Sequence, residues 1–292
     1  MPRLHDAQIE LPDALVRNLV DSLFPQWSGP GLRRVESDGT IHRVDRLGDD
    51  LVVRLPFIDW AVEDVARDAA RLPILADALP VRVPALVGRG VPSEGMPWHW
   101  GVYSWLDGRH PSPGSDDDTL IPGLVAALKA LRNMAPDGPP SPAAFDAALD
   151  DVVTRPKVQV LTPEAPWALD VWDAAIEAGA HTGRAAWVHG DLMPGNLLLD
   201  HEGRLASILD WGAAGIADPA LDLLSGWTCL GPEGRATFLA QMEATPAQIA
   251  LARGLALRKV AWGLTYYEAT LPGFAAILRH VLAQIGDDAM SA

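Results

Sequence analysis

Three oxygen-bearing side chains follow short apolar runs in the second half of the sequence. Asp191 and Asn196 stand in "WVHGDLMPGNLLLD" (Trp187–Asp200), and Asp210 closes the next apolar run, fourteen residues after Asn196. Loops held by a rigid scaffold often carry functional groups, because the scaffold can aim them. Carboxylate and amide oxygens are also the ligands that Mg²⁺ prefers in proteins. A plain hairpin turn made by Asp, Pro, Gly and Asn is the alternative.

The spacing of these side chains matches the pattern of phosphoryl transfer. In that reaction an Asp on the catalytic loop accepts the proton of the acceptor hydroxyl. An Asn further along that loop and an Asp after the next strand hold the metal ions. The sequence has His189, Asp191 and Asn196 in the order His-x-Asp-x4-Asn, and Asp210 then opens Asp-x-Gly, as in kinases. A metal-dependent hydrolase could use His189, Asp191 and Asp210, but it would leave Asn196 without a role.

The composition limits the class of protein. The chain has 292 residues, a formal net charge of −15 and one cysteine, Cys229. A single cysteine excludes an intrachain disulfide framework and fits a reducing cytoplasm, and we expect it to be a small apolar filler. Nucleic-acid binding needs clustered Lys and Arg, so the acidity argues against it. No apolar stretch approaches the length of a membrane span and the N-terminus is too polar for a signal peptide, so we expect a cytoplasmic protein without a membrane partner.

The N-terminal half predicts a small α+β lobe. Apolar residues at helical spacing indicate a helix over Leu11–Phe24. Three strands separated by turns follow within residues 32–56, and a helix over Asp59–Leu79 has Asp59 as its expected N-cap. The runs "RVPALVGRG" and "WHWGVYSWLDG" add two strands, so about five strands accompany this helix.

The C-terminal half is predicted to be mostly helical. Helical segments are expected at 120–134, 141–153, 166–180, 222–230, 234–242, 246–271 and 274–285. The exception is Ala185–Trp211, where two short strands carry the polar motif. A connector rich in Pro, Gly and Asp, Asp107–Asp118, places the boundary near Val102–Gly108. The expected domains are therefore residues 1–106 and 107–292.

Two segments resemble a known family. "VHGDLMPGNLLLD" and "ILDWGAAGIADPALDL" resemble the signature segments of the aminoglycoside phosphotransferase-like kinases, small-molecule relatives of protein kinases. "GTIHRVDRLGDDLVVRLP" and "WHWGVYSWLDG" extend the resemblance into the N-terminal half. It implies the protein-kinase-like two-lobe fold. A small N-terminal lobe with a five-stranded antiparallel sheet and helices would bind nucleotide and end in a hinge. A larger, mostly helical C-terminal lobe would carry out catalysis and bind the acceptor.

The resemblance assigns roles to the residues of the two signature segments. Asp191 would be the catalytic base, and Asn196 and Asp210 would be the Mg²⁺ ligands. His189 would support the loop by packing and hydrogen bonding, because hard Mg²⁺ prefers oxygen ligands. Asp222 would tie the backbone of the catalytic loop in place.

One further residue of these segments is assigned from its local sequence alone. "ADPALDLL" indicates the start of a helix, with Asp218 as the N-cap and Pro219 in the first turn.

The N-terminal lobe would hold ATP or GTP, the phosphate donor. A short loop between its first two strands, with the sequence "SDGT" (Ser37–Thr40), would cover the phosphates through its backbone N–H groups. Four residues of this kind often form only a hairpin turn. Arg54 would contact the phosphates where kinases in general have lysine, since its fork can hold two phosphate oxygens. Glu63, Asp64 or Asp68 would orient Arg54, and we favour Asp68 over the alternative that all three are solvated. The expected nucleotide-binding residues are Ser37, Asp38, Gly39, Thr40, His42, Arg54, Asp68, Val102, Tyr103, Ser104 and Trp105, the last four through their backbone at the hinge.

The acceptor is expected to bind to the C-terminal helices. Trp262 and Tyr266 share one helix face and Glu268 follows them, so the three could form an aromatic wall with an acid. Ordinary helix packing is the alternative. If the acceptor is polycationic, the negative charge should gather around Asp191, Glu268 and the pair Asp287–Asp288.

The predicted enzyme is a phosphotransferase with an alcohol group as acceptor. We expect it to transfer the γ-phosphate of ATP or GTP to a hydroxyl of an antibiotic or related natural product, such as an aminoglycoside or macrolide, and so to give resistance. The alternative is a metabolic kinase of the same fold that acts on choline, homoserine, a sugar or a fructosamine. A metal-dependent hydrolase and an inactive binding module are rivals from other classes. The expected partners are the nucleotide and the small-molecule acceptor, bound by a monomer or homodimer.

Overall fold

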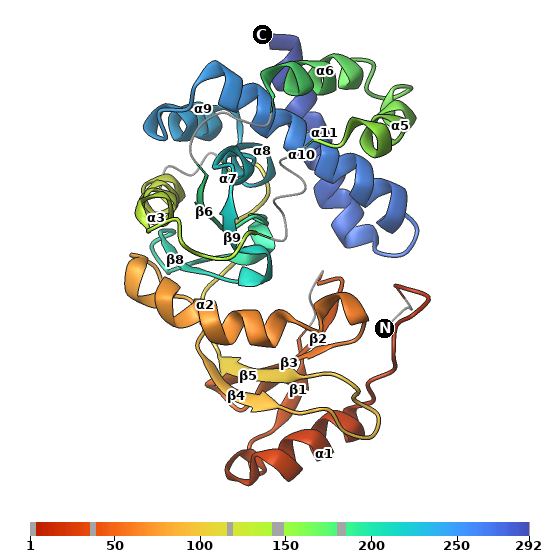
Figure 1. The fold of residues 1–292 in the computed structure, drawn as a ribbon, viewed down its shortest axis with the longest axis vertical. Helices are drawn as coiled ribbons and strands as arrows, with labels where there is room; N and C mark the ends of the chain where they lie inside the picture. The colour runs from red at the N-terminus through yellow and green to blue at the C-terminus, as the bar shows by residue number, and fades with distance from the viewer. Residues whose placement is uncertain (1–3, 36–38, 116–118, 142–148, 180–184, 292) are drawn as a thin grey trace. The chain divides into compact units, whose positions relative to one another are not determined.

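The computed structural model describes residues 4–35, 39–115, 119–141, 149–179 and 185–291 (Figure 1). It divides into two compact units. The small unit comprises Met1–Asp77 and Arg82–Asp107, and the large unit comprises Ala78–Val81 and Gly108–Ala292. Each unit has buried hydrophobic residues of its own.

The small unit contains the predicted five-stranded antiparallel sheet. The strand order is β1-β2-β3-β5-β4. The strands are β1 (Leu32–Arg34), β2 (His42–Leu47), β3 (Leu51–Pro56), β4 (Leu86–Gly90) and β5 (Trp100–Ser104). The helices of this unit are α1 (Asp13–Leu23), the 3₁₀ turns η1 (Pro25–Trp27) and η2 (Asp59–Ala61), and α2 (Asp64–Ala78).

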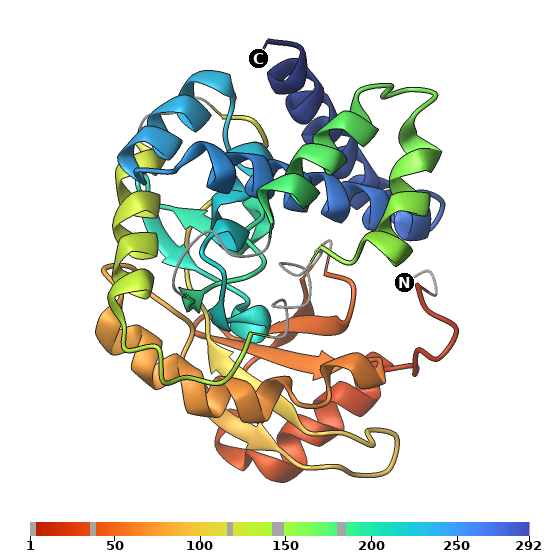
Figure 2. The same cartoon turned by 45° about the horizontal axis from the view of Figure 1, so that its top comes forward.

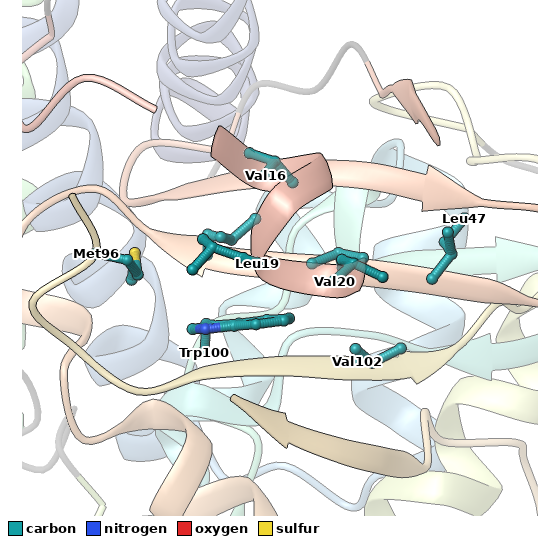
Figure 3. Packing of buried hydrophobic residues seen from close by; sticks show 9 residues of the cluster. Val16, Leu19, Val20, Leu47, Met96, Trp100 and Val102 are labelled. Atoms are coloured by element: carbon teal, nitrogen blue, oxygen red, sulfur yellow. The ribbon is translucent and has the colours of Figure 1, made fainter. Parts of the chain in front are cut away.

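Alternation along the strands gives the sheet two different faces. Trp100 and Val102 of β5 are fully buried in one cluster with Leu19 of α1 (Figure 3). Successive side chains of a strand point to opposite faces, so Tyr103 of β5 belongs to the other face, where it contacts α2. Full burial of an apolar side chain such as Leu19 contributes roughly 1.5–3 kcal/mol. One face of the sheet therefore packs on α1, and the other carries polar groups next to α2.

The predicted start of α2 is wrong. Asp59 opens the separate turn η2, whose N-cap is Ile58, and α2 begins only at Asp64. Within the turn, the ring of Trp60 lies edge-on to that of His5, with ring centroids 4.8 Å apart. This tertiary contact lies outside the helical pattern and favours a separate turn over an earlier helix start.

The large unit is mostly helical, as predicted (Figure 2). Its helices are α3 (Leu120–Asn133), α5 (Asp151–Leu161), α6 (Ala168–Ala178), α7 (Ala220–Leu223), α8 (Ser225–Thr228), α9 (Pro232–Gln241), α10 (Pro246–Tyr267) and α11 (Pro272–Ser291). The long helix α10 packs against α5, α6 and α11. A Cβ on Gly254 would lie 2.2 Å from the Cβ of Ala175, so glycine allows α10 to approach α6 closely. No helix in the described ranges is long and apolar enough to cross a membrane.

The helix predicted over residues 141–153 falls partly outside the described residues, which omit 142–148. Its described end leads into α5, which continues eight residues beyond the predicted end although it contains Pro156. Asp150 caps this helix by accepting hydrogen bonds from the backbone N–H groups of Val152 (3.1 Å) and Val153 (3.4 Å). The cap satisfies two of the donors at the helix start, which offsets part of the cost of the proline.

The segment Ala185–Trp211 contains three short strands instead of the predicted two, and a fourth follows just after it. They are β6 (Ala186–Val188), β7 (Leu197–Leu199), β8 (Leu205–Ile208) and β9 (Gly215–Ala217). β6 pairs with β9, and β7 pairs with β8. The chain between β6 and β7 is therefore a loop that joins two small sheets, and the alternative of a plain hairpin turn is wrong.

Candidate active site

The loop between β6 and β7 is anchored by one buried carboxylate. Asp222 of α7 accepts hydrogen bonds from the backbone N–H groups of His189 (2.9 and 3.1 Å) and Gly190 (2.9 Å). Gly190 has a φ of +82°, which glycine adopts without strain, and the chain turns there just before Asp191. Burial raises the pKa of Asp222, whereas the two N–H groups and the charge of Arg132 act to lower it. Asp222 thus makes the backbone contacts that the sequence analysis expected.

His189 joins this loop to the loop after β8. Its side chain is fully buried, and its ring lies edge-on to Trp211 with centroids 4.6 Å apart. The backbone N–H of Asp191 donates to Nδ1 (3.2 Å), so this nitrogen is unprotonated and Nε2 donates to the carbonyl of Leu209 (2.9 Å). Both ring nitrogens are used in holding the two loops, which leaves neither for a metal ion.

Asn196 completes the connection between the two loops. Its Nδ2 donates to the carbonyl of Asp191 (2.8 Å), and its own carbonyl accepts from the N–H of Leu209 (2.8 Å). The next residue, Asp210, has a φ of +55°, a left-handed conformation that Asp tolerates better than most residues. These bonds bring Asp191, Asn196 and Asp210 onto two neighbouring loops of the large unit.

The donor set of these loops suits a hard cation that keeps other ligands. With Nδ2 of Asn196 donating, Oδ1 is the atom that this amide can offer to a cation. Asp210 adds a carboxylate. Among the residues that the structure describes, no group of three or more His, Cys, Asp and Glu could hold a metal ion. One carboxylate and one amide oxygen, with phosphates and water for the rest, fit the way in which proteins bind Mg²⁺.

The prediction that Asp218 is the N-cap of α7 is wrong by one residue. The helix begins at Ala220, and Pro219 occupies the N-cap position. The carboxylate of Asp218 still accepts a hydrogen bond from the backbone N–H of Ala220 (2.9 Å). The carboxylate therefore supports the start of the helix that carries Asp222.

In the small unit, Arg54 of β3 lies beside the acid that the sequence analysis favoured. Its Nη1 is 3.8 Å from Oδ2 of Asp68, on α2. The hydroxyl of Tyr103 donates to the same oxygen (2.7 Å), and the guanidinium lies 5.6 Å from the centroid of the Tyr103 ring. Burial, followed by the charge of Asp68, raises the pKa of Tyr103, so this phenol remains a donor. Asp68 and Tyr103 together fix the position of Arg54.

The other two candidate acids contact different cations. Glu63 pairs with Arg67 (2.9 Å), and Asp64 also contacts Arg67. Oδ2 of Asp64 is 3.3 Å from Nε2 of His42, a buried residue of β2. The His42 side chain therefore faces α2, and only its backbone remains as a candidate for the phosphate loop.

The phosphate loop is described only in part. Ser37 and Asp38 lie outside the described residues. Gly39 and Thr40 precede β2, and the carbonyl of Thr40 is 2.6 Å from Nε2 of His5. The phosphate contacts expected of these four residues stay predictions.

Two of the hinge amides expected to bind the base are already used inside the small unit. Val102, Tyr103 and Ser104 belong to β5, which pairs with β3 on one side and β4 on the other. The N–H of Ser104 donates to the carbonyl of Ala85 (2.9 Å), and that of Trp105 donates to the carbonyl of Asp50 (2.7 Å). These two N–H groups are therefore engaged inside the small unit, and the expected contacts of the hinge backbone with the base, through its N–H and C=O groups, stay a prediction.

Comparison with known proteins decides the family. Residues 32–257 match the model of the phosphotransferase enzyme family. The chain belongs to this family. A curated relative, the uncharacterized protein YcbJ of Bacillus subtilis, is 25% identical over 212 residues, which are 67% of this chain and 68% of that protein.

Solved structures of antibiotic phosphotransferases share the fold of this phosphotransferase. The GDP complex of wild-type aminoglycoside 2'-phosphotransferase-IIIa aligns with a TM-score of 0.72 at 17% identity, over 95% of this chain and 99% of that one. Macrolide 2'-phosphotransferase type I aligns with a TM-score of 0.57 at 24% identity, over 94% and 98%. The fold is thus the protein-kinase-like fold of the aminoglycoside phosphotransferases. As a member of the phosphotransferase enzyme family, the chain is a phosphotransferase.

One residue of the site of this phosphotransferase, Lys259, is not indicated by any sequence motif. The ammonium group of Lys259, on α10, makes an ion pair with Oδ1 of Asp191. The two residues are 68 positions apart, so local spacing does not reveal the pair. A weak signal exists, because Lys259 is one of three lysines and interrupts the buried run Leu255–Ala261.

The expected acceptor residues occupy the outer part of α10. The side chains of Trp262 and Tyr266 are 38% and 46% exposed, so the alternative of ordinary core packing is wrong for both. Glu268 follows the helix and pairs with Arg279, which also contacts Glu164 (3.0 Å). The aromatic side chains remain candidates for acceptor contact, whereas the carboxylate of Glu268 already has a cation beside it.

Cys229 behaves as the expected apolar filler. It is fully buried, and burial raises the pKa of its thiol to about 12. A thiol with such a pKa stays protonated and is not a nucleophile at neutral pH.

Proposed function

We propose that this phosphotransferase transfers the γ-phosphate of ATP or GTP to a hydroxyl of an antibiotic or related natural product, and so gives resistance to it. Asp191 is the base that accepts the hydroxyl proton. The observation that carries this proposal is the pair of hydrogen-bonded loops that gathers Asp191, Asn196 and Asp210. A metal-dependent hydrolase is a weaker explanation, because both nitrogens of His189 are already occupied.

Asp191 acts as the acceptor oxygen forms its bond to the γ-phosphorus. The hydroxyl proton moves to the carboxylate, and the bond between the γ-phosphorus and the bridging oxygen breaks to release the nucleoside diphosphate. A positioned base of this kind contributes about 10²–10⁴-fold to the rate. The contacts of His189 and Asp222 with the loop backbone hold the carboxylate before substrate arrives, so little reorganisation is needed.

Asn196 and Asp210 would hold Mg²⁺ through the amide Oδ1 and the carboxylate. When bound, this ion neutralises negative charge on the phosphates. The donor set supports this assignment, since it supplies oxygen atoms and leaves coordination positions for phosphate and water.

The small unit, which we take to bind the nucleotide, contributes Arg54. Its guanidinium would pair with phosphate oxygens, and Asp68 and Tyr103 would keep it in position. The aminoglycoside relative solved with GDP supports a nucleotide in this fold. The large unit would then carry out catalysis and bind the acceptor.

The acceptor class has two candidates. The names of the aminoglycoside and macrolide relatives support an antibiotic. One observation favours the alternative, a metabolic kinase for an uncharged hydroxyl compound such as a sugar. It is the ammonium group of Lys259 on Asp191, where an amine of the acceptor would meet a like charge.

The test is a transfer assay with γ-labelled ATP and GTP against a panel of acceptors. The panel holds aminoglycosides, macrolides, nucleoside and peptide antibiotics, choline, homoserine, sugars and a fructosamine. We expect label on at least one hydroxyl with the wild-type protein and its loss with Asp191→Asn. Resistance is then tested by expressing both proteins in a sensitive strain. Label on none of these acceptors would contradict the proposal.

A further inference from the structure

The proposed base shares its carboxylate with a cation of the same chain. Lys259 contacts Oδ1 of Asp191, and the two side chains are 27% and 38% exposed, so the pair is accessible to solvent within the large unit. A hydroxyl that donates to Oδ2 of Asp191 therefore comes to lie next to an ammonium group. The charge of this ammonium acts on whatever the acceptor carries beside that hydroxyl.

More cations lie along α10 beyond this pair. Lys259, Trp262 and Tyr266 are spaced by three and four residues, so they share one side of the helix. The ring of Trp262 has Lys157 of the adjoining helix α5 at 4.4 Å from its centroid and Arg258 at 5.4 Å. The exposed ring of Trp262, one turn along α10 from Lys259, thus has positive charge beside it.

The carboxylates that could attract a polycation have cations of their own. Glu268, just beyond α10, pairs with Arg279. Asp288 of α11 pairs with Arg235 (3.4 Å) and Arg253 (3.2 Å). Both acids were candidates for an acidic acceptor site, and these pairs weaken the field that either one presents to a ligand.

From these contacts we infer that Lys259 is a specificity-determining residue, which selects acceptors without an ammonium group beside the reacting hydroxyl. The inference rests on the proposed function in one respect, that Asp191 is the base. Like charges a few ångströms apart repel each other in a partly buried site. The ammonium group of Lys259 therefore weakens the binding of an acceptor that carries an amine beside the reacting hydroxyl. The substrate class that follows is an uncharged or anionic hydroxyl compound with an apolar surface for Trp262 and Tyr266.

The experiment compares two forms of one acceptor. Kanamycin carries several ammonium groups, and its fully N-acetylated derivative keeps the hydroxyls without the charge. Binding of both to the nucleotide-bound protein is measured by calorimetry, and kcat/KM is measured wherever transfer occurs. The variants are Lys259→Met and Lys259→Gln, with Lys259→Arg to restore the charge. Lys129→Met is the matched control, because it removes the same charge from an exposed position on α3.

The wild-type protein should bind the acetylated form at least as tightly as the amine. Lys259→Met and Lys259→Gln should shift the ratio of the two affinities about tenfold towards the amine, which is about 1.4 kcal/mol. Lys259→Arg and Lys129→Met should keep the wild-type ratio. Tighter binding of the amine than of the acetylated form by the wild-type protein would overturn the inference. The same affinity ratio in all variants, or the failure of every variant to bind either form, would also overturn it. Failure of the proposed function is a separate result, namely the absence of phosphoryl transfer to every acceptor of the panel.

Discussion

Asp191 is the single residue whose chemistry separates turnover from binding. Asp191→Asn keeps the size of the side chain and its loop contacts, which run through the backbone of residue 191. It removes the acceptor of the proton, so kcat should fall by about 10²–10⁴-fold while nucleotide affinity changes little. Steady-state kinetics and nucleotide titration measure the two effects. The control is Asp170→Asn, an exposed acid of α6, and wild-type turnover in Asp191→Asn would remove this residue from the mechanism.

Asp222 is the residue on which the shape of the catalytic loop depends. Its buried carboxylate accepts from the N–H groups of His189 and Gly190. Asp222→Ala leaves both donors buried without an acceptor, so the free energy of unfolding should fall by at least about 1–3 kcal/mol, and kcat should fall with it. Asp222→Asn retains one acceptor oxygen and should cost less. Denaturant unfolding and kcat are the measurements, and unchanged values in Asp222→Ala would show that the loop does not need this anchor.

Single residues were predictable from the sequence where the chemistry is local. The residues His189, Asp191, Asn196, Asp210 and Asp222 stand within 34 residues of one another. The structure places the first four on two connected loops and Asp222 on α7, where it holds one of these loops. Lys259 was not predictable, because its partner lies far away in the sequence. The hydrogen bonds that the N–H groups of Ser104 and Trp105 make inside the small unit were not predictable for a similar reason, since the sequence does not show which backbone groups neighbouring segments occupy.

At the scale of elements, the position of Arg54 depends on three of them. β3 carries Arg54, α2 carries Asp68 and β5 carries Tyr103, and these side chains meet on one face of the sheet. Arg54→Ala should raise the KM for nucleotide several-fold and lower kcat. Arg54→Lys keeps the charge but loses the two parallel N–H donors of the guanidinium, so it should retain part of the activity. Kinetics with varied nucleotide at saturating acceptor measure both. Normal kinetics in Arg54→Ala would mean that another cation contacts the phosphates.

Most element types were predictable from periodicity, but their ends and partners were not. The five strands of the small unit and the helices of the large unit follow the hydrophobic pattern. The start of α2 does not follow this pattern, because the residues before it form a separate turn in which the ring of Trp60 contacts that of His5. Three strands formed in the segment where two were predicted, and a fourth, β9, follows it, since pairing between distant segments, such as β6 with β9, leaves no periodic signal in the chain.

At the scale of the whole molecule, the net charge of −15 does not by itself imply a cationic ligand. Three of the acids that were expected to attract a polycation, Asp191, Glu268 and Asp288, each make an ion pair with a lysine or arginine. A large excess of negative charge spread over a surface favours solubility, and only a local concentration of it steers a ligand. The distribution of these pairs therefore favours an acceptor that is held by apolar contacts.

The salt dependence of acceptor binding follows from this distribution. With nucleotide saturating, the KM of the best acceptor should change less than about twofold between low salt and 0.15 M, where the screening length is about 8 Å. The reason is that an uncharged acceptor gains nothing from the long-range field that salt screens. Lys259→Met should leave this flat response unchanged, since it alters a contact at short range. A KM that rises steeply with salt would show that the acceptor is a polycation drawn to carboxylates, and it would return the choice of substrate to the aminoglycoside class.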